Sequence, residues 1–220
     1  FIRGGKFMFV DETIRSFMDS LESKDSTLVG GSAAALASSL GSSLMLMVGN
    51  LTFGKKAYES LDEETRKAFQ DSYDGFVKLK NELYDSIDKD KAAFDAYMES
   101  LRMPKDTDEQ KEERKKALAK ATAEALEVPL ETAKQGLKIL QIARVFADHG
   151  NAMAITDVGV GSLMAYAGIE GALFNVYINL NSIKDEEYKA AKKAESDNIK
   201  AEAARLRDEL LKTVYSRIGY

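Results

Sequence analysis

Two long stretches of the chain carry almost no charge, and they constrain the fold more than any other feature. Ser26 to Gly54 has no charged residue, and Gly150 to Leu180 has only Asp157 and Glu170. About twenty apolar residues suffice to cross a bilayer. The serines and glycines of the first stretch, however, favour a tightly packed central helix over a lipid-facing one. We therefore expect buried helices of small residues at the centre of the fold, and no membrane-spanning segment.

Helical periodicity accounts for most of the remaining chain. The chain has only two prolines and no strong hairpin dipeptide between alternating runs, which favours helix over strand. Phe174 to Leu180 alternates like a strand but has no evident partner, so we predict it to be helical. The expected helices are Asp11–Ser23, Ala33 to about Thr52 with Ser32 as its cap, Asp62–Leu101, Glu109–Leu126, Pro129 to about Ala147, Ala152–Leu180 with an interruption near Ala167–Gly168, and a surface helix from about Glu186.

These helices predict an all-α fold, a single-domain helical bundle with long central helices. The 220 residues, 45% of them hydrophobic, provide enough apolar surface for one substantial core. No linker or repeat divides the chain, so we assign residues 10–220 to one domain. Residues 1–9 are interpreted as an N-terminal extension of vector origin, because Met8 is a natural start and no secretory signal precedes it.

Composition excludes several classes of function. The absence of cysteine rules out disulfides, thiol catalysis and thiolate metal sites, and fits a reducing compartment such as the cytoplasm. A single histidine, His149, argues against a histidine-rich metal site or a histidine-relay hydrolase, so we expect no metal. The net charge of -5 argues against general nucleic-acid binding, which needs a basic surface.

Asp90 is the first candidate for chemistry. It lies three residues after Ile87 and four before Phe94, within an apolar stripe on one face of the predicted helix Asp62–Leu101. Burying a lone carboxylate costs several kcal/mol unless it is paired or neutral. The alternative is an acid at the edge of the stripe that reaches solvent or pairs with Lys91. Asp157, within the second uncharged stretch, is a candidate for the same reason.

Three further groups of polar residues are candidates for ligand binding. Free backbone N–H groups at the start of the small-residue helix could seat an anion or ligand. Asn175 and Asn179 are four residues apart, so they share a helix face and could bind one planar ligand or join two helices. Lys55 and Lys56 form either a solvated pair or an attractor for an anionic group.

Five motifs in order resemble the formiminotetrahydrofolate cyclodeaminase and methenyltetrahydrofolate cyclohydrolase family. They extend over most of the chain, from Val10 to about Ala190. The motifs are GGSAAALASSLGSSLMLMVGNLTFGKKAY at 30–58, DKDKAAFDAYMESLRMPKDT at 88–107, VPL at 128–130, HGNAMAITDVGVG at 149–161 and FNVYINL at 174–180. One departure is that Leu28-Val29 replace the proline and first glycine of the family's glycine loop, and a β-branched valine tolerates positive φ poorly.

The resemblance implies an all-helical fold, a tetrahydrofolate derivative as substrate and a homodimer. It also implies that Asp90 is the proton-transferring residue, which the stripe indicates independently. The remaining family positions, which would bind substrate, fall on Gly30, Gly31, Ser32, Asn151, Asp157, Asn175 and Asn179. With a folate substrate, Lys55 and Lys56 could attract the glutamate tail, and the alternative is an ordinary solvated pair.

The favoured activity is a cyclodeaminase, which converts 5-formiminotetrahydrofolate to 5,10-methenyltetrahydrofolate and ammonia in histidine degradation. A separate formiminotransferase would then supply its substrate. The first alternative is a cyclohydrolase that opens 5,10-methenyltetrahydrofolate to 10-formyltetrahydrofolate. The alternative of another class is a non-catalytic folate-binding or dimeric helical module, in which Asp90 should form a salt bridge.

Overall fold

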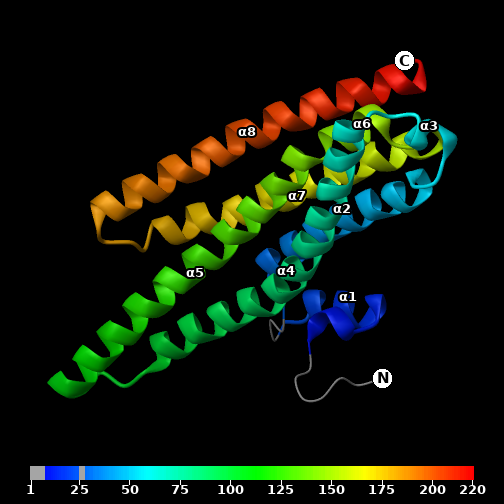
Figure 1. Cartoon of the computed structure of the whole chain (residues 1–220). Coiled ribbons are helices and arrows are strands. Elements are labelled where there is room, and N and C mark those ends of the chain that lie inside the picture. Colours follow the sequence, from blue (N-terminus) through cyan, green and yellow to red (C-terminus); the bar gives the residue numbers. More distant parts are fainter. Residues whose placement is uncertain (1–7, 25–27) are drawn as a thin grey trace.

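The computed structural model describes residues 8–24 and 28–220, and within these ranges the fold is helical without a strand (Figure 1). Of the predicted extension 1–9, residues 1–7 lie outside the described residues. The elements are η1 (Phe9–Asp11), α1 (Ile14–Glu22), α2 (Gly30–Thr52), α3 (Lys56–Glu59), α4 (Glu63–Arg102), α5 (Asp108–Ile142), α6 (Arg144–His149), η2 (Ala152–Ala154), α7 (Ile155–Leu180) and α8 (Glu186–Ile218).

The two weakly charged stretches form α2 and α7, which pack side by side in opposite directions at the centre of the bundle. A Cβ built on Gly41 of α2 would lie 2.8 Å from the carbonyl oxygen of Gly161 of α7. A Cβ on Gly168 of α7 would lie 2.6 Å from the carbonyl oxygen of Ala34 of α2. The absence of side chains at these glycines therefore lets the two helix backbones touch.

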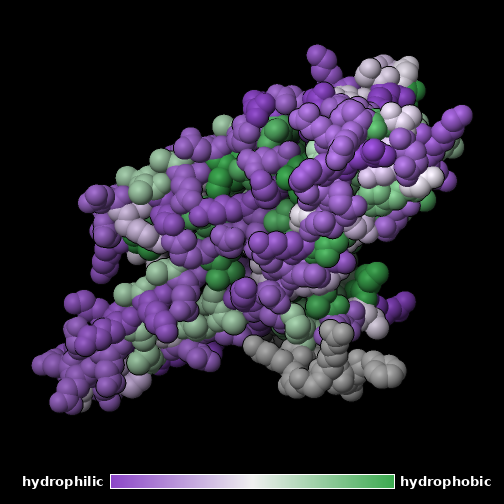
Figure 2. All heavy atoms as spheres, viewed as in Figure 1, coloured by the Kyte–Doolittle hydropathy of each residue, from purple (hydrophilic) through white to green (hydrophobic). Residues whose placement is uncertain are grey.

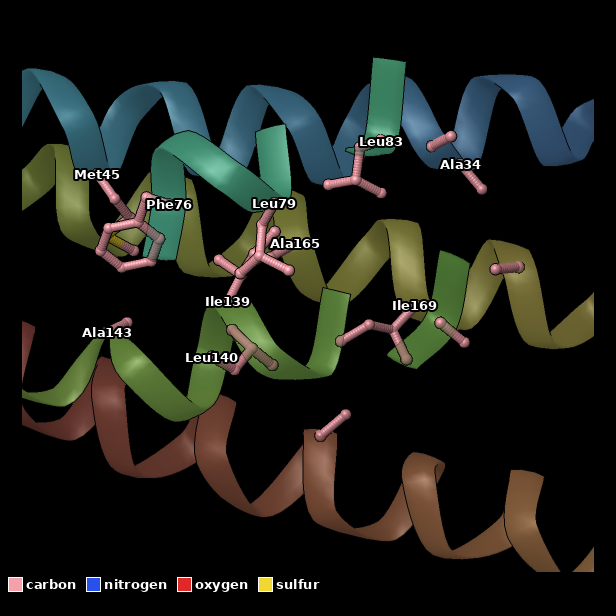
Figure 3. Packing of buried hydrophobic residues seen from close by; sticks show 14 of the residues in the cluster. Ala34, Met45, Phe76, Leu79, Leu83, Ile139, Leu140, Ala143, Ala165 and Ile169 are labelled. Carbon is pink, nitrogen blue, oxygen red and sulfur yellow. The ribbon is translucent and has the colours of Figure 1, made fainter. Parts of the chain in front are cut away.

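The long helices α4, α5 and α8 surround this pair. Figure 3 shows side chains of α2, α4, α5 and α7 meeting in one core, among them Met45, Phe76, Ile139 and Ile169. α8 packs along α7 and α5, as expected for a surface helix. In Figure 1, α4 and α5 continue together beyond the other helices as a hairpin, and Figure 2 shows that its far end is hydrophilic.

Two predicted helix boundaries are wrong. Pro129 does not begin a helix but lies inside α5, because its neighbours on the buried face hold the helix together. α7 runs through Ala167 and Gly168 without a break, since Gly168 serves close packing and not chain reversal. The predicted helical state of Phe174–Leu180 is confirmed.

By length and composition alone, two segments of the described chain are apolar enough to cross a membrane, Gly30–Thr52 and Ala152–Leu180. In the bundle, 61% and 50% of their respective apolar windows are buried. The parts that are not buried form an apolar surface on α2 and α7.

We expect Gly168→Ala to destabilise the protein by about 1–3 kcal/mol, since the new methyl group would push against the backbone of α2. Urea unfolding followed by circular dichroism measures the change. The matched control is Gly159→Ala in the same helix, where a Cβ meets only the methyl groups of Val214, the nearest at 3.1 Å. An equal loss in both variants would contradict the proposed backbone contact.

Candidate functional site

A pocket of about 200 Å³ opens at the end of the bundle where α2 begins and α7 ends. Asp90 of α4 lies in its wall with the two candidate asparagines of α7. Its remaining lining is mostly apolar. The lining residues are Val29, Asp90, Ala93, Phe94, Tyr97, Ala125, Asn175, Ile178 and Asn179.

Asp90 is buried, with 8% of its surface exposed, and lies against the first turn of α2. The Ser32 hydroxyl lies 2.9 Å from the carbonyl oxygen of Ile87 and 3.2 Å from Oδ2 of Asp90, and can donate to either. A Cβ on Gly31 would lie 2.2 Å from Oδ1 of Asp90, so any other residue there would displace the carboxyl group. Ser32 therefore holds the acid from within α2 and is not the N-cap that the sequence predicted.

Burial raises the pKa of Asp90 above its usual value of 3.8, and hydrogen bonds from the side chain and backbone of Ser32 oppose this shift. Among the described residues, no lysine, arginine or histidine forms an ion pair with Asp90. Lys91, the pairing partner considered from the sequence, pairs with Asp95 instead. A buried carboxyl group with a raised pKa, in the wall of a pocket, is suited to exchange protons with a bound ligand.

The first turn of α2 has no side-chain cap, because its N-cap residue is Val29. Val29 has φ -131° and ψ 170°, an extended conformation that a β-branched residue adopts without strain. The replacement of a family glycine by valine therefore leaves the loop unstrained. A Cβ on Gly30 would come within 4.0 Å of Nδ2 of Asn175, so the start of α2 and the end of α7 adjoin at the pocket.

The two asparagines present acceptor oxygens to this pocket. Nδ2 of Asn175 donates to the carbonyl oxygen of Gly171 at 2.9 Å, and Nδ2 of Asn179 donates to that of Ala125 at 2.6 Å. A carbonyl oxygen can only accept, so each amide nitrogen must face its carbonyl and each Oδ1 remains for a ligand. With Asp90, the pocket thus favours a ligand edge that carries N–H groups.

The other candidate residues lie at the opposite end of the bundle. Lys55 and Lys56 follow the C-terminal end of α2, about 33 Å along that helix from Gly30. Asp157 lies in the first turn of α7, about 27 Å along that helix from Asn175. Asn151 binds the end of α2, through Leu51 and Thr52. Within one chain, therefore, these four residues do not reach the pocket of Asp90.

Phe94, Tyr97 and Ala125 line the pocket but were not predicted as site residues. Phe94 belongs to the apolar stripe, and Tyr97 follows Asp90 by seven residues, so helical spacing places both near Asp90. The sequence gives no indication that Ala125 belongs to the site, because its backbone carbonyl, and not a reactive side chain, makes the contact. Among residues 8–24 and 28–220, no group of three or more histidine, aspartate and glutamate side chains is placed to hold a metal ion.

The chain is similar in sequence to several known proteins. A family model described as formiminotransferase-cyclodeaminase matches residues 13–198. A methenyltetrahydrofolate cyclohydrolase from Methylorubrum extorquens is 36% identical over 95% of this chain and 99% of its own length. A formimidoyltransferase-cyclodeaminase from Gallus gallus is 35% identical over 82% of this chain, which spans only 32% of that longer protein.

The fold also has a counterpart among solved structures. A formiminotetrahydrofolate cyclodeaminase from Thermotoga maritima superimposes with a TM-score of 0.83, covering 95% of this chain and 98% of the other. The two sequences are 20% identical. This similarity shows a shared all-α fold, as the sequence predicted.

The raised pKa of Asp90 has a consequence for stability. The folded protein holds this proton more tightly than the unfolded chain, so the stabilisation is complete below about pH 4 and is lost as the pH rises through the folded-state pKa. Asparagine cannot ionise. We therefore expect the free energy of unfolding of Asp90→Asn to increase relative to the wild type between about pH 4 and pH 8.

Urea titrations across this pH range measure the difference. The control is Asp85→Asn, an exposed aspartate on the same helix, which should show no such trend. A constant difference between Asp90→Asn and the wild type at every pH would contradict the raised pKa.

Proposed function

Because the chain belongs to the formiminotransferase-cyclodeaminase family, we propose that Asp90 transfers protons at the one-carbon unit of a tetrahydrofolate substrate. The enzyme acts in folate one-carbon chemistry, of the cyclodeaminase or cyclohydrolase type. The observation that supports the role of Asp90 is its burial in a pocket wall without a counter-ion. A non-catalytic module would instead be expected to neutralise this carboxylate by a salt bridge.

In the cyclodeaminase reaction, nitrogen 10 of 5-formiminotetrahydrofolate attacks the formimino carbon and closes the ring. Nitrogen 10 loses a proton, and the leaving nitrogen, which enters as the –CH=NH2+ of the protonated formimino group, gains one and departs as ammonia. A carboxyl group with a raised pKa can accept the first proton and deliver the second. The free Oδ1 atoms of Asn175 and Asn179 suit the N–H groups of the pterin edge.

The cyclohydrolase reaction is the second candidate, and one observation favours it. The relative from Methylorubrum extorquens, which matches from end to end, carries that name. In this reaction water adds to the methenyl carbon of 5,10-methenyltetrahydrofolate, and the bond to nitrogen 5 breaks to leave 10-formyltetrahydrofolate. The water oxygen becomes the formyl oxygen, so the water loses both protons; one reaches nitrogen 5 and the other is released to solvent. A carboxyl group that carries a proton from the water to nitrogen 5 can therefore serve this reaction as well.

We expect Asp90→Asn to lower kcat about 10²–10⁴-fold while folate binding and the fold persist, since asparagine keeps the shape but carries no transferable proton. Near-ultraviolet absorbance of the methenyl chromophore reports both reactions. An increase in this absorbance with 5-formiminotetrahydrofolate identifies a cyclodeaminase. An accelerated decrease with 5,10-methenyltetrahydrofolate identifies a cyclohydrolase. Asp85→Asn is the control. Wild-type turnover in a folded Asp90→Asn variant would refute the assignment.

We further propose a homodimer, supported by an apolar surface on α2 and α7, and a cytoplasmic location, which the absence of cysteine favours. Large apolar side chains with 39% to 66% of their surface exposed follow one face of this helix pair, and large exposed apolar patches mark interaction surfaces. They are Leu40, Met47 and Leu51 of α2 and Val160, Leu163, Phe174 and Ile178 of α7. Ile178 also lines the pocket, so this apolar surface extends to the site.

The pocket of one chain also lacks groups that a folate requires. At about 200 Å³ it is smaller than the usual 300–1,000 Å³ of a ligand site, and among residues 8–24 and 28–220 no lysine or arginine lines it to bind a glutamate tail. The missing cations lie at the other end of the apolar surface. Gly30 lies about 17 Å from Gly41 along α2, and Thr52, the last residue of α2 before Lys55, lies about 17 Å from Gly41 in the opposite direction.

A two-fold axis can therefore complete the site. If it lies in the interface, perpendicular to α2 and level with Gly41, it packs the two apolar surfaces face to face with their helices antiparallel. Lys55, Lys56 and Asp157 of the second copy then lie beside the pocket of the first. This arrangement unites the family motif residues that a single chain keeps apart, so each site draws on both copies.

Heterodimers test this arrangement. Asp90→Asn should be inactive, and Lys55→Ala/Lys56→Ala should have a raised KM. A heterodimer of the two, isolated with two affinity tags, holds one site with both defects and one intact site, so we expect about half the wild-type activity. If each site lay within one chain, the heterodimer would not exceed half the activity of the lysine variant.

A surface substitution tests the interface itself. Leu163→Glu should convert the dimer to an inactive monomer in light scattering, whereas Val77→Glu, exposed on α4 outside the apolar surface, should not. A Leu163→Glu protein that remains dimeric, or a wild type that binds lipid vesicles through this surface as a monomer, would contradict the homodimer.

We also propose that a formiminotransferase supplies substrate if formimino-folate is turned over.

A further inference from the structure

Pro129 leaves one backbone carbonyl of α5 without its helical partner. Within an α-helix the N–H of residue 129 would donate to the carbonyl oxygen of Ala125, but proline has no N–H. Pro129 and its neighbours Leu126 and Leu130 are buried, and the helix continues through them. The structure thus tolerates an interior proline, which usually destabilises a helix relative to alanine.

The carbonyl oxygen left free by Pro129 is the one that Asn179 contacts. Nδ2 of Asn179 donates to it at 2.6 Å, across from α7 to α5, and both Ala125 and Asn179 line the pocket. This hydrogen bond fixes the orientation of the Asn179 amide as well as its position. Because the carbonyl can only accept, it forces the amide nitrogen of Asn179 toward α5 and the oxygen Oδ1 away from it.

We propose that Pro129 is a positioning residue that makes Asn179 an obligatory hydrogen-bond acceptor for the substrate. Resting on the proposed function, this inference narrows the ligand edge to one that donates N–H groups, as a reduced pterin does. The amide of Asn175 is oriented in the same way, because its Nδ2 donates to the carbonyl oxygen of Gly171 in the same helix. The motif Val128–Leu130, which has no chemically reactive side chain, thereby acquires a role in substrate recognition.

The decisive variant is Pro129→Ala, which restores an N–H that competes with Nδ2 of Asn179 for the Ala125 carbonyl oxygen. Replacing an interior helix proline by alanine should raise the urea midpoint of unfolding. KM should nevertheless rise about tenfold with kcat within twofold, because an amide held less firmly no longer presents a fixed acceptor. A purely structural proline would leave KM unchanged. Pro104→Ala, in the link between α4 and α5, is the control and should leave KM unchanged.

A double-mutant cycle tests the contact without any assay of turnover. Asn179→Asp places an acceptor against the Ala125 carbonyl, so it should lower the urea midpoint in the wild-type background. In the Pro129→Ala background the carbonyl has an N–H partner, so the same substitution should lower the midpoint less. Additive effects, or an unchanged KM in Pro129→Ala, would overturn the inference. An inactive wild type with a non-additive cycle would instead reject only the proposed function.

Discussion

The contact between the backbones of α2 and α7 determines where every other part of the molecule lies. Gly41 and Gly168 allow this contact because each faces a carbonyl oxygen of the opposite helix. The two helices then act as a single unit, against which α4, α5 and α8 pack their apolar faces. As a result, the start of α2 lies beside the end of α7, and Asp90 and the two asparagines line one pocket.

The sequence predicts best those features that depend on periodicity. The stripe of α4 placed Asp90 on a buried face, and the structure confirms this burial. Local signals of proline and glycine were less reliable. They predict a helix start at Pro129 and an interruption at Gly168, but tertiary packing overrides both preferences. Such outcomes depend on contacts between helices, which spacing within one helix does not contain.

The same limit applies to the candidate site. The resemblance grouped Lys55, Lys56, Asn151 and Asp157 with Asp90, whereas the lengths of α2 and α7 keep them at opposite ends of one chain. A motif set records which residues belong together in function and not which copy of the chain supplies each. Ala125 was invisible to any motif of reactive side chains, because a missing N–H at Pro129 makes its carbonyl available.

With Asp90 in its proposed role, the absence of a counter-ion among the described residues affects the two reactions differently after chemistry. The 5,10-methenyl unit is a cation, so it can pair with an ionised Asp90. When water opens the ring, that positive charge disappears, which favours release of the product. When ammonia leaves and the ring closes, the positive charge is created beside the carboxylate, which favours retention of the product. An acid without a counter-ion therefore favours product release in the cyclohydrolase reaction and product retention in the cyclodeaminase reaction.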